Sequence, residues 1–284
     1  MAIKIASLKF KGGIGSSSIV NTLASIYSED KKVLIVDADN QNTQITLLNA
    51  RGKADKNSSL SGVLNGGFDP KKCIIEINEN LHLLQSGGKS IETFNKKYNS
   101  DATGSTRLKE AMTELDSEYD VILYDASPTL NLLHQNILVA ADYVILPCDL
   151  DVLSLSASRS MIHFIENTKI EMAKLDISVA DILGIIPNRR DGRRIVDDQI
   201  LDDLYRLEDQ DLLAGGTVFN ALRDSSNMKT AQARRKPLNI VYPKGNLTED
   251  FRELAKNIET KINERSIHPS LFSVQNTNTV EAMQ

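Results

Sequence analysis

Short apolar runs alternate along this chain with longer segments in which apolar residues recur at helical spacing. The apolar runs are typical of buried strands and lie at residues 3–8, 33–37, 81–85, 119–125, 143–147, 182–188 and 218–223. Helices are predicted at residues 19–27, 107–115, 130–140, 153–174 and 247–263, with loops around one short helix at 50–72 and a polar loop at 91–105. The alternation predicts an α/β fold with a doubly wound, mostly parallel sheet flanked by helices.

The pattern predicts one domain over residues 1–264. No internal repeat of fixed period and no Pro/Ser-rich linker divides this part of the sequence. From Arg265 to Gln284 the sequence is polar and unpatterned, so we expect a flexible C-terminal tail at residues 265–284.

Composition narrows the classes of protein that the chain can belong to. Its 284 residues are 41% hydrophobic and 25% charged, which is ordinary for a globular protein with a large core. Because the net charge is −5, contact with nucleic acid needs a local basic patch, and the absence of Trp argues against a base-stacking surface. Cys73 and Cys148 lack metal-ligand spacing and are expected in the core. No signal peptide or apolar span of about 18 residues is found, which predicts a cytoplasmic protein.

A glycine-rich loop, Phe-Lys-Gly-Gly-Ile-Gly-Ser-Ser-Ser at residues 10–18, joins the first strand to the first helix. Backbone amides of such a loop and the helix N-terminus can surround a phosphate, although a tight turn entering a helix has the same pattern. Ser17 lies where the phosphate-loop motif places a hydroxyl on Mg²⁺. The motif has lysine directly before this residue, but here the residue is Ser16, and the cation is Lys11 at the start of the loop.

Acidic residues follow the ends of two predicted strands. Asp37 and Asp39 follow the second strand, and Asp125 ends a later one, three residues before Pro128. Carboxylates at the carboxyl edge of a parallel sheet lie where ligands bind, and an acid there commonly holds Mg²⁺. Capping of a helix or turn by Asp39 or Asn40 is the alternative for the first pair.

Together these motifs resemble the deviant Walker A family of ParA/MinD partition and positioning ATPases over residues 3–264. Lys11, Gly12, Gly13, Gly15 and Ser17 match K-G-G-x-G-K-[ST], whereas Ser16 departs from it; D-x-D-P-Q is matched except at Asn40, and D-x-x-P by Asp125 and Pro128. The resemblance implies that ATP or ADP is bound by Lys11, Gly12, Gly13, Ile14, Gly15, Ser16, Ser17, Ser18 and Asn188. It implies Mg²⁺ at Ser17, Asp39 and Asp125, water positioning by Asp37, and adenine contact by Asn188, which could instead close a turn.

The resemblance also implies a working cycle. ATP closes two subunits into a homodimer in which Lys11 crosses to the partner's phosphates, the dimer binds non-specific DNA on the nucleoid, and a ParB-like or cargo-adaptor protein stimulates hydrolysis. The cargo is a plasmid, a chromosome or an organelle. The candidate DNA-binding residues are Arg189, Arg190, Arg193, Arg194, Arg223, Lys229, Arg234, Arg235 and Lys236. They form a first cluster at 189–194 and a second cluster at 223–236. A solvated face is the alternative, because acidic residues at 191–203 offset the first cluster.

Serine at position 16 predicts a weak Mg²⁺-dependent ATPase. Loss of a charged hydrogen bond in a dry site costs about 1.5–3 kcal/mol, and a hydroxyl brings no charge. Either Lys11 or another lysine substitutes for the missing group, or nucleotide binding is weak and hydrolysis slow or absent.

Other functions remain as alternatives. A MinD-like membrane positioner needs an amphipathic segment, and residues 265–284 lack helical apolar periodicity, so no membrane contact is expected. A nucleotide-independent scaffold of the same fold is favoured by Ser16 and opposed by the acids. A nitrogenase-reductase-like enzyme needs cluster-binding cysteines that Cys73 and Cys148 do not provide. A second phosphate loop at residues 86–90 is discounted because no apolar helix is predicted after it.

Overall fold

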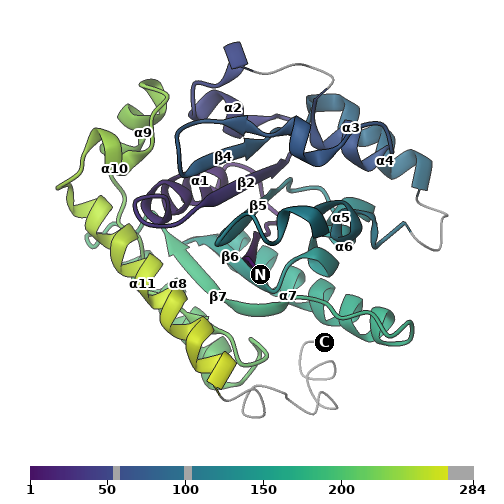
Figure 1. Ribbon diagram of the computed structural model, residues 1–284. Helices are drawn as coiled ribbons and strands as arrows, with labels where there is room; N and C mark the ends of the chain where they lie inside the picture. The colour runs from purple at the N-terminus through teal and green to yellow at the C-terminus, as the bar shows by residue number, and fades with distance from the viewer. Residues whose placement is uncertain (54–57, 99–103, 268–284) are drawn as a thin grey trace.

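The computed structural model describes residues 1–53, 58–98 and 104–267 (Figure 1). Its strands are β1 (Ile3–Ser7), β2 (Val33–Ala38), β3 (Ile75–Glu76), β4 (Leu81–Leu84), β5 (Val121–Ala126), β6 (Tyr143–Asp149), β7 (Asp181–Asn188) and β8 (Thr217–Val218). Its α-helices are α1 (Ser16–Tyr27), α2 (Thr43–Leu47), α3 (Leu60–Leu64), α4 (Ile91–Tyr98), α5 (Arg107–Met112), α6 (Leu132–Ala140), α7 (Val152–Ala173), α8 (Ile195–Asp209), α9 (Ser226–Ala233), α10 (Leu238–Val241) and α11 (Asn246–Ile267).

The strands form one 8-stranded sheet in the order β3-β4-β2-β5-β1-β6-β7-β8. Neighbouring strands are parallel except at one edge, where β3 and β4 are antiparallel. Helices cover both faces of the sheet (Figure 1). The predicted α/β class with a mostly parallel sheet is therefore confirmed.

The apolar runs are continuous because each central strand faces two cores. In β2, Leu34 and Val36 pack into the core under α3 to α8, whereas Val33 and Ile35 pack into the core under α1, α2 and α9 to α11. Side chains of a strand alternate between its faces, so both sets must be apolar. This arrangement leaves the polar ends of the strands, at the carboxyl edge, as the place for chemistry.

Three polar residues lie side by side at that edge. In the strand registers Ser7 of β1 pairs with Asp125 of β5, and Asp125 pairs with Asp37 of β2. The sheet thus brings together side chains that are far apart in the sequence.

The prediction of a polar loop over residues 91–105 is wrong in its first half, where α4 forms. Ile91, Phe94 and Tyr98 are buried, and their spacing places them on one helix face. The polar residues between these positions concealed the pattern. Residues 99–103 lie outside the described residues.

The helix α4 directly follows residues 86–90, so the argument from sequence against a phosphate loop there no longer holds. Within this segment Gly88–Ser90 forms a 3-10 turn, in which the Ser90 hydroxyl donates to the Gly87 carbonyl at 2.8 Å.

Other element boundaries also differ from the predictions. The late strand expected at 218–223 is reduced to β8 (Thr217–Val218), and α8, in the acidic stretch, was not predicted. The boundary predicted at residue 265 falls inside α11, which continues to Ile267. Arg265 is 5% exposed and its Nη2 donates to the carbonyls of Ile182 and Gly215, both at 2.7 Å. The rest of the predicted tail, residues 268–284, lies outside the described residues.

Candidate functional site

The glycine-rich loop lies at the carboxyl edge of the sheet, between β1 and α1 (Figure 1). Gly13 and Gly15 have φ angles of +80° and +84°, in the left-handed region that favours glycine. A Cβ on Gly15 would also lie 2.7 Å from Nδ2 of Asn188. The Gly15 carbonyl accepts the amides of Ser18 and Ile19 at 3.0 and 2.9 Å, so the N-terminus of α1 opens directly onto the loop.

The loop forms one wall of a cavity of about 530 Å³. The other walls come from the segments that follow β2 and β5, and from Gln232 of α9. Of the predicted site residues, those at positions 12–18 and Asp39 line this cavity. A wall of backbone amides at a helix N-terminus, with a carboxylate opposite, fits a phosphate chain and its accompanying cation.

Ser16 and Ser17 direct their side chains to different surroundings. Ser16 is 2% exposed, and its hydroxyl lies 2.9 Å from the hydroxyl of Ser7 on β1. Ser17 is half-buried in the first turn of α1 and lines the cavity. The Ser16 hydroxyl is therefore engaged inside the protein, whereas Ser17 is placed where the motif predicts a metal ligand.

The acids after β2 are held in a tight turn. Asp37 is fully buried and accepts the amides of Asp39 and Gln44 at 3.0 and 2.9 Å. Burial, followed by the nearby charge of Asp125, raises the pKa of Asp37 well above its ordinary value. Asp39 lines the cavity and accepts the amide of Gln41 at 3.0 Å. The roles predicted for Asp37 and Asp39 stay predictions.

Asp125 is fully buried at the end of β5 and is held by two side chains that sequence analysis did not single out. Nζ of Lys9 lies 3.3 Å from Oδ1, and Nε2 of Gln44 donates to Oδ2 at 2.8 Å. Gln44 also donates to the Ser17 carbonyl at 2.9 Å, which links the acid to α1. Each oxygen of Asp125 thus has a hydrogen-bond partner within the chain, and the predicted role of Asp125 toward Mg²⁺ stays a prediction.

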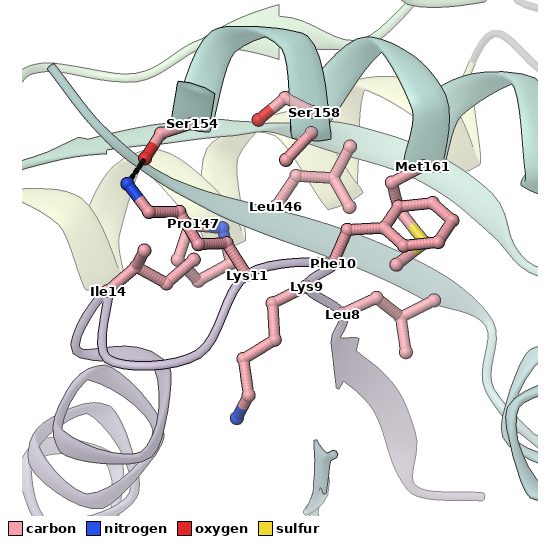
Figure 2. Close-up of a pocket in the computed structure, with 11 residues that line it drawn as sticks. Leu8, Lys9, Phe10, Lys11, Ile14, Leu146, Pro147, Ser154, Ser158 and Met161 are labelled. Carbon is pink, nitrogen blue, oxygen red and sulfur yellow. Dashed lines mark hydrogen bonds between the residues drawn. The ribbon is translucent and has the colours of Figure 1, made fainter. Parts of the chain in front are cut away.

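Lys11 lies outside the large cavity and points to α7. Its Nζ lies 2.8 Å from Oδ2 of Asp151 and donates to the Ser154 hydroxyl at 3.1 Å (Figure 2). Asp151 also caps α7, since it accepts the Ser154 amide at 2.9 Å. Partial burial acts to raise the pKa of Asp151, but the bonds from Lys11 and Ser154 outweigh it and the pKa lies below its ordinary value. The lysine that is expected to reach a partner is thus held within its own subunit.

Asn188 lies at the end of β7 beside a second cavity of about 220 Å³. It is 8% exposed, and its Nδ2 donates to the Ile14 carbonyl at 2.7 Å. Apolar side chains of Met228, Leu247 and Phe251 form part of the wall. This mixture of apolar surface and a few polar groups next to the loop is suited to a planar base, and the predicted adenine contact of Asn188 stays a prediction.

The first cluster of predicted DNA-binding arginines, at residues 189–194, and Arg223 of the second cluster are paired with carboxylates of the same chain. The pairs are Arg189 with Asp149, Arg190 with Asp198, Arg193 and Arg194 with Asp191, and Arg223 with Asp250. Arg189 also donates to the Gly13 carbonyl at 2.6 Å, which makes it part of the loop's support. These partners reduce the positive charge that this region offers to phosphate.

The other members of the second cluster, on α9 and in the turn into α10, are different. Lys229, Arg234, Arg235 and Lys236 are all exposed, and none has an ion pair within the described part of the chain. The candidate surface for phosphate is therefore centred on these four residues, although the DNA-binding prediction itself is not tested by the geometry.

Clusters of metal-ligating side chains and membrane-spanning helices are both absent from the described residues. Residues 1–53, 58–98 and 104–267 contain no group of three or more His, Cys, Asp or Glu that could hold a metal on its own. In the same part of the chain, no helix is long and apolar enough to cross a membrane.

Comparison with known proteins connects this geometry to a family. A family model described as an AAA domain matches residues 2–178. The virulence plasmid ParA family protein pGP5-D of Chlamydia psittaci is 24% identical over 264 residues, which are 91% of this chain and 95% of that protein. The chromosome-partitioning ATPase Soj of Thermus thermophilus is 28% identical over 202 residues, 69% of this chain and 73% of Soj.

A solved structure shows the same fold. The ATP complex of a McdA variant from Cyanothece superposes with a TM-score of 0.77 at 19% sequence identity, and the match covers 92% of this chain and 96% of that chain. The fold is thus shared with a protein whose structure was determined as an ATP complex.

Proposed function

Because the chain belongs to the ParA/Soj/MinD family of P-loop ATPases and is a ParA-family partition ATPase, we propose that it binds ATP with Mg²⁺ at residues 11–18. In this proposal ATP closes two copies into a homodimer, the dimer holds non-specific DNA, and a ParB-like or cargo-adaptor protein triggers release. The cargo is a plasmid, a chromosome or an organelle.

One observation carries the nucleotide-binding part of the proposal. The amide-rich loop at residues 12–18, the N-terminus of α1 and the carboxylate of Asp39 all face one cavity of about 530 Å³. Oriented amides and a helix N-terminus stabilise phosphate without a large rearrangement. The adjoining cavity at Asn188 lies on the same loop, so base and phosphates can bind together.

Ser17, Asp39 and Asp125 are the proposed metal-site residues. Mg²⁺ bound with a nucleotide neutralises charge that develops on the phosphates during transfer. Ser17 and Asp39 already line the cavity, whereas Asp125 lies behind it, bonded to Lys9 and Gln44. Asp37 is the proposed residue for positioning water, but both of its carboxylate oxygens accept amides, so turnover is expected to be slow.

Lys11 supports the dimerisation part of the proposal. Its ion pair with Asp151 is partly exposed, with side-chain exposures of 35% and 42%. A pair of this kind contributes about 0.2–1 kcal/mol, so Lys11 can exchange Asp151 for the phosphates of a partner at small cost.

Titration with ATP and ADP in the presence of Mg²⁺ tests nucleotide binding, and the mass of the protein in solution tests dimerisation. We expect saturable binding of both nucleotides and a shift from monomer to dimer with ATP. Absence of binding at millimolar nucleotide contradicts the proposal. Binding to random DNA that appears only with ATP and weakens with salt tests the last step.

A scaffold that acts through protein contacts alone is the second candidate. It is favoured by the engagement of both Asp125 and Lys11 with partners in their own chain. For a scaffold, we expect the solution mass to be the same with and without ATP.

A further inference from the structure

Lys9 lies directly before the glycine-rich loop, at a position to which the phosphate-loop motif assigns no role. Its side chain is 6% exposed, and its Nζ lies 3.3 Å from Oδ1 of Asp125. In Figure 2, Lys9 and Lys11 leave the backbone in opposite directions, Lys11 toward Ser154 on α7 and Lys9 away from it. Lys9 therefore directs its ammonium group into the site, whereas Lys11 directs its own outward.

The phosphate cavity has few sources of positive charge. Among the described residues that line it, Lys9 is the only lysine or arginine. Ser16, at the position where the motif predicts lysine, carries no charge and its hydroxyl lies 2.9 Å from that of Ser7. Lys11 is held by Asp151. A phosphate chain in this cavity thus has one cationic side chain of the same subunit within its walls.

The Lys9 ammonium group also has unused donors. It carries three N–H groups, and within the described part of the chain its only hydrogen-bond partner is Asp125. A buried ammonium with spare donors beside an open cavity is set up to bind an anionic group. Asp125 keeps its second oxygen bonded to Gln44 when Lys9 turns toward such a group.

We propose that Lys9 supplies the ammonium group that contacts the terminal phosphates of the nucleotide, in place of the lysine that the loop motif predicts at position 16. This inference rests on the nucleotide binding proposed above. The lysine chain is flexible, so Nζ can move from the carboxylate of Asp125 to a phosphate oxygen and leave that carboxylate oxygen to the metal-binding edge of the site. Lys9 thereby favours di- and triphosphates over monophosphates.

Four proteins form the experiment: the wild type, Lys9→Met, Ser16→Lys and the double variant. Their dissociation constants for ATP and AMP are measured by calorimetry with Mg²⁺. Lys9→Met is expected to weaken ATP binding by about tenfold to a hundredfold, the cost of a charged hydrogen bond. AMP binding is expected to stay within about twofold, since AMP lacks the phosphates that Lys9 contacts. Ser16→Lys is expected to restore ATP binding in the Lys9→Met background and to improve it much less in the wild type.

Two further variants separate contact with phosphate from a structural role. Lys4 lies near the start of β1, the strand that leads to Lys9, and is paired with Asp116 at 3.0 Å. Lys4→Met is therefore the matched control and should leave ATP binding unchanged. Lys9→Gln keeps a donor for Asp125 without the charge. If Lys9→Met does not fold, as thermal melting would show, Lys9→Gln takes its place in the comparison.

The outcomes distinguish this inference from the proposed function. A wild type that binds no ATP overturns both. A wild type that binds ATP overturns the inference alone if the Lys9 variants bind ATP equally well, if they lose ATP and AMP affinity to the same extent, or if Ser16→Lys gives equal gains in both backgrounds. A selective loss of ATP affinity that Ser16→Lys repairs supports it.

Discussion

Lys9 and Lys11 are separated by one residue, yet they form ion pairs of opposite character. Lys9 and Asp125 are 6% and 0% exposed, whereas Lys11 and Asp151 are 35% and 42% exposed. Lys9 reaches Asp125 on β5 and Lys11 reaches Ser154 on α7. The two side chains leave the backbone in opposite directions (Figure 2). A buried pair is costly to break by removal of one partner, and a partly exposed pair is not. The loop is therefore flanked by a buried charge beside the phosphate cavity and by a partly exposed charge on the side of α7.

The largest effect on stability is expected from the buried pair. Lys9→Met leaves the carboxylate of Asp125 without its cation, and this should reduce the free energy of unfolding by about 3–5 kcal/mol. Urea unfolding followed by circular dichroism measures it. The double variant Lys9→Met/Asp125→Asn should recover part of the loss. An unchanged unfolding midpoint in Lys9→Met would contradict the contrast between the two pairs.

A buried histidine near Lys9, His134, should make the stability of the protein depend on pH. Burial, with a smaller contribution from the charge of Lys9, lowers the pKa of His134 from 6.5 to about 4, while its Nε2 lies 2.9 Å from the Ser127 carbonyl. The unfolded chain binds this proton more tightly, so the free energy of unfolding contributed by His134 falls as the pH drops from 6.5 toward 4. The full change is on the order of 3 kcal/mol.

The free energy of unfolding of the wild type minus that of His134→Gln isolates the contribution of His134. Other titrating groups, including Asp37 with its raised pKa, are common to both proteins. Denaturant melts at several pH values should show that the wild type loses stability relative to His134→Gln as the pH falls. His163→Gln on α7 serves as the control. A difference that is constant with pH is the contrary result.

Arginines with and without an ion pair in the chain should also differ in their contribution to DNA binding. Arg234→Ala with Arg235→Ala removes two exposed charges without ion pairs, and the slope of log affinity against log salt should fall by roughly 2, about 0.9 for each phosphate contact. Arg193→Ala, whose guanidinium is paired with Asp191 at 2.8 Å, should change the slope much less. Fluorescence anisotropy with random duplex DNA and ATP gives both slopes. Equal slopes for the two variants would assign the DNA surface elsewhere.

The smallest stability effect is expected at the exterior pair. Lys11→Met removes a bond to the N-cap of α7 and should reduce the free energy of unfolding by about 0.2–1 kcal/mol. The same variant should lose the ATP-dependent dimer, which light scattering detects. Stability loss as large as that of Lys9→Met would show that Lys11 is an interior group as well.

The features predicted well from the sequence are those with a local cause. The buried strands carry apolar residues on both faces, and the left-handed Gly13 and Gly15 belong to a contiguous motif, so fold class and loop were readable in the sequence. The helix α4 was not, because its apolar positions are widely spaced among polar ones. Its helical face becomes meaningful only against the core that covers Phe94.

The unpredicted parts of the site depend on tertiary pairing. Nothing in the sequence near Lys9 indicates that β1 and β5 are neighbours in register, which is what brings Lys9 to Asp125. Asp151 and Lys11 likewise meet across 140 residues. The neutralisation of the arginines at 189–194 was partly visible in the acids that follow them, but the partners Asp149 of Arg189 and Asp250 of Arg223 were not.

The last turn of α11 has a practical consequence for anyone who trims this protein. Arg265 donates hydrogen bonds to the carbonyls of Ile182, near the start of β7, and Gly215, just before β8. Ending the chain at 264, as composition suggests, would remove the hydrogen-bond donor of both carbonyl oxygens and destabilise the edge of the sheet at β7 and β8. A shortened version meant to reveal what the remaining C-terminal residues contribute should keep everything through Ile267.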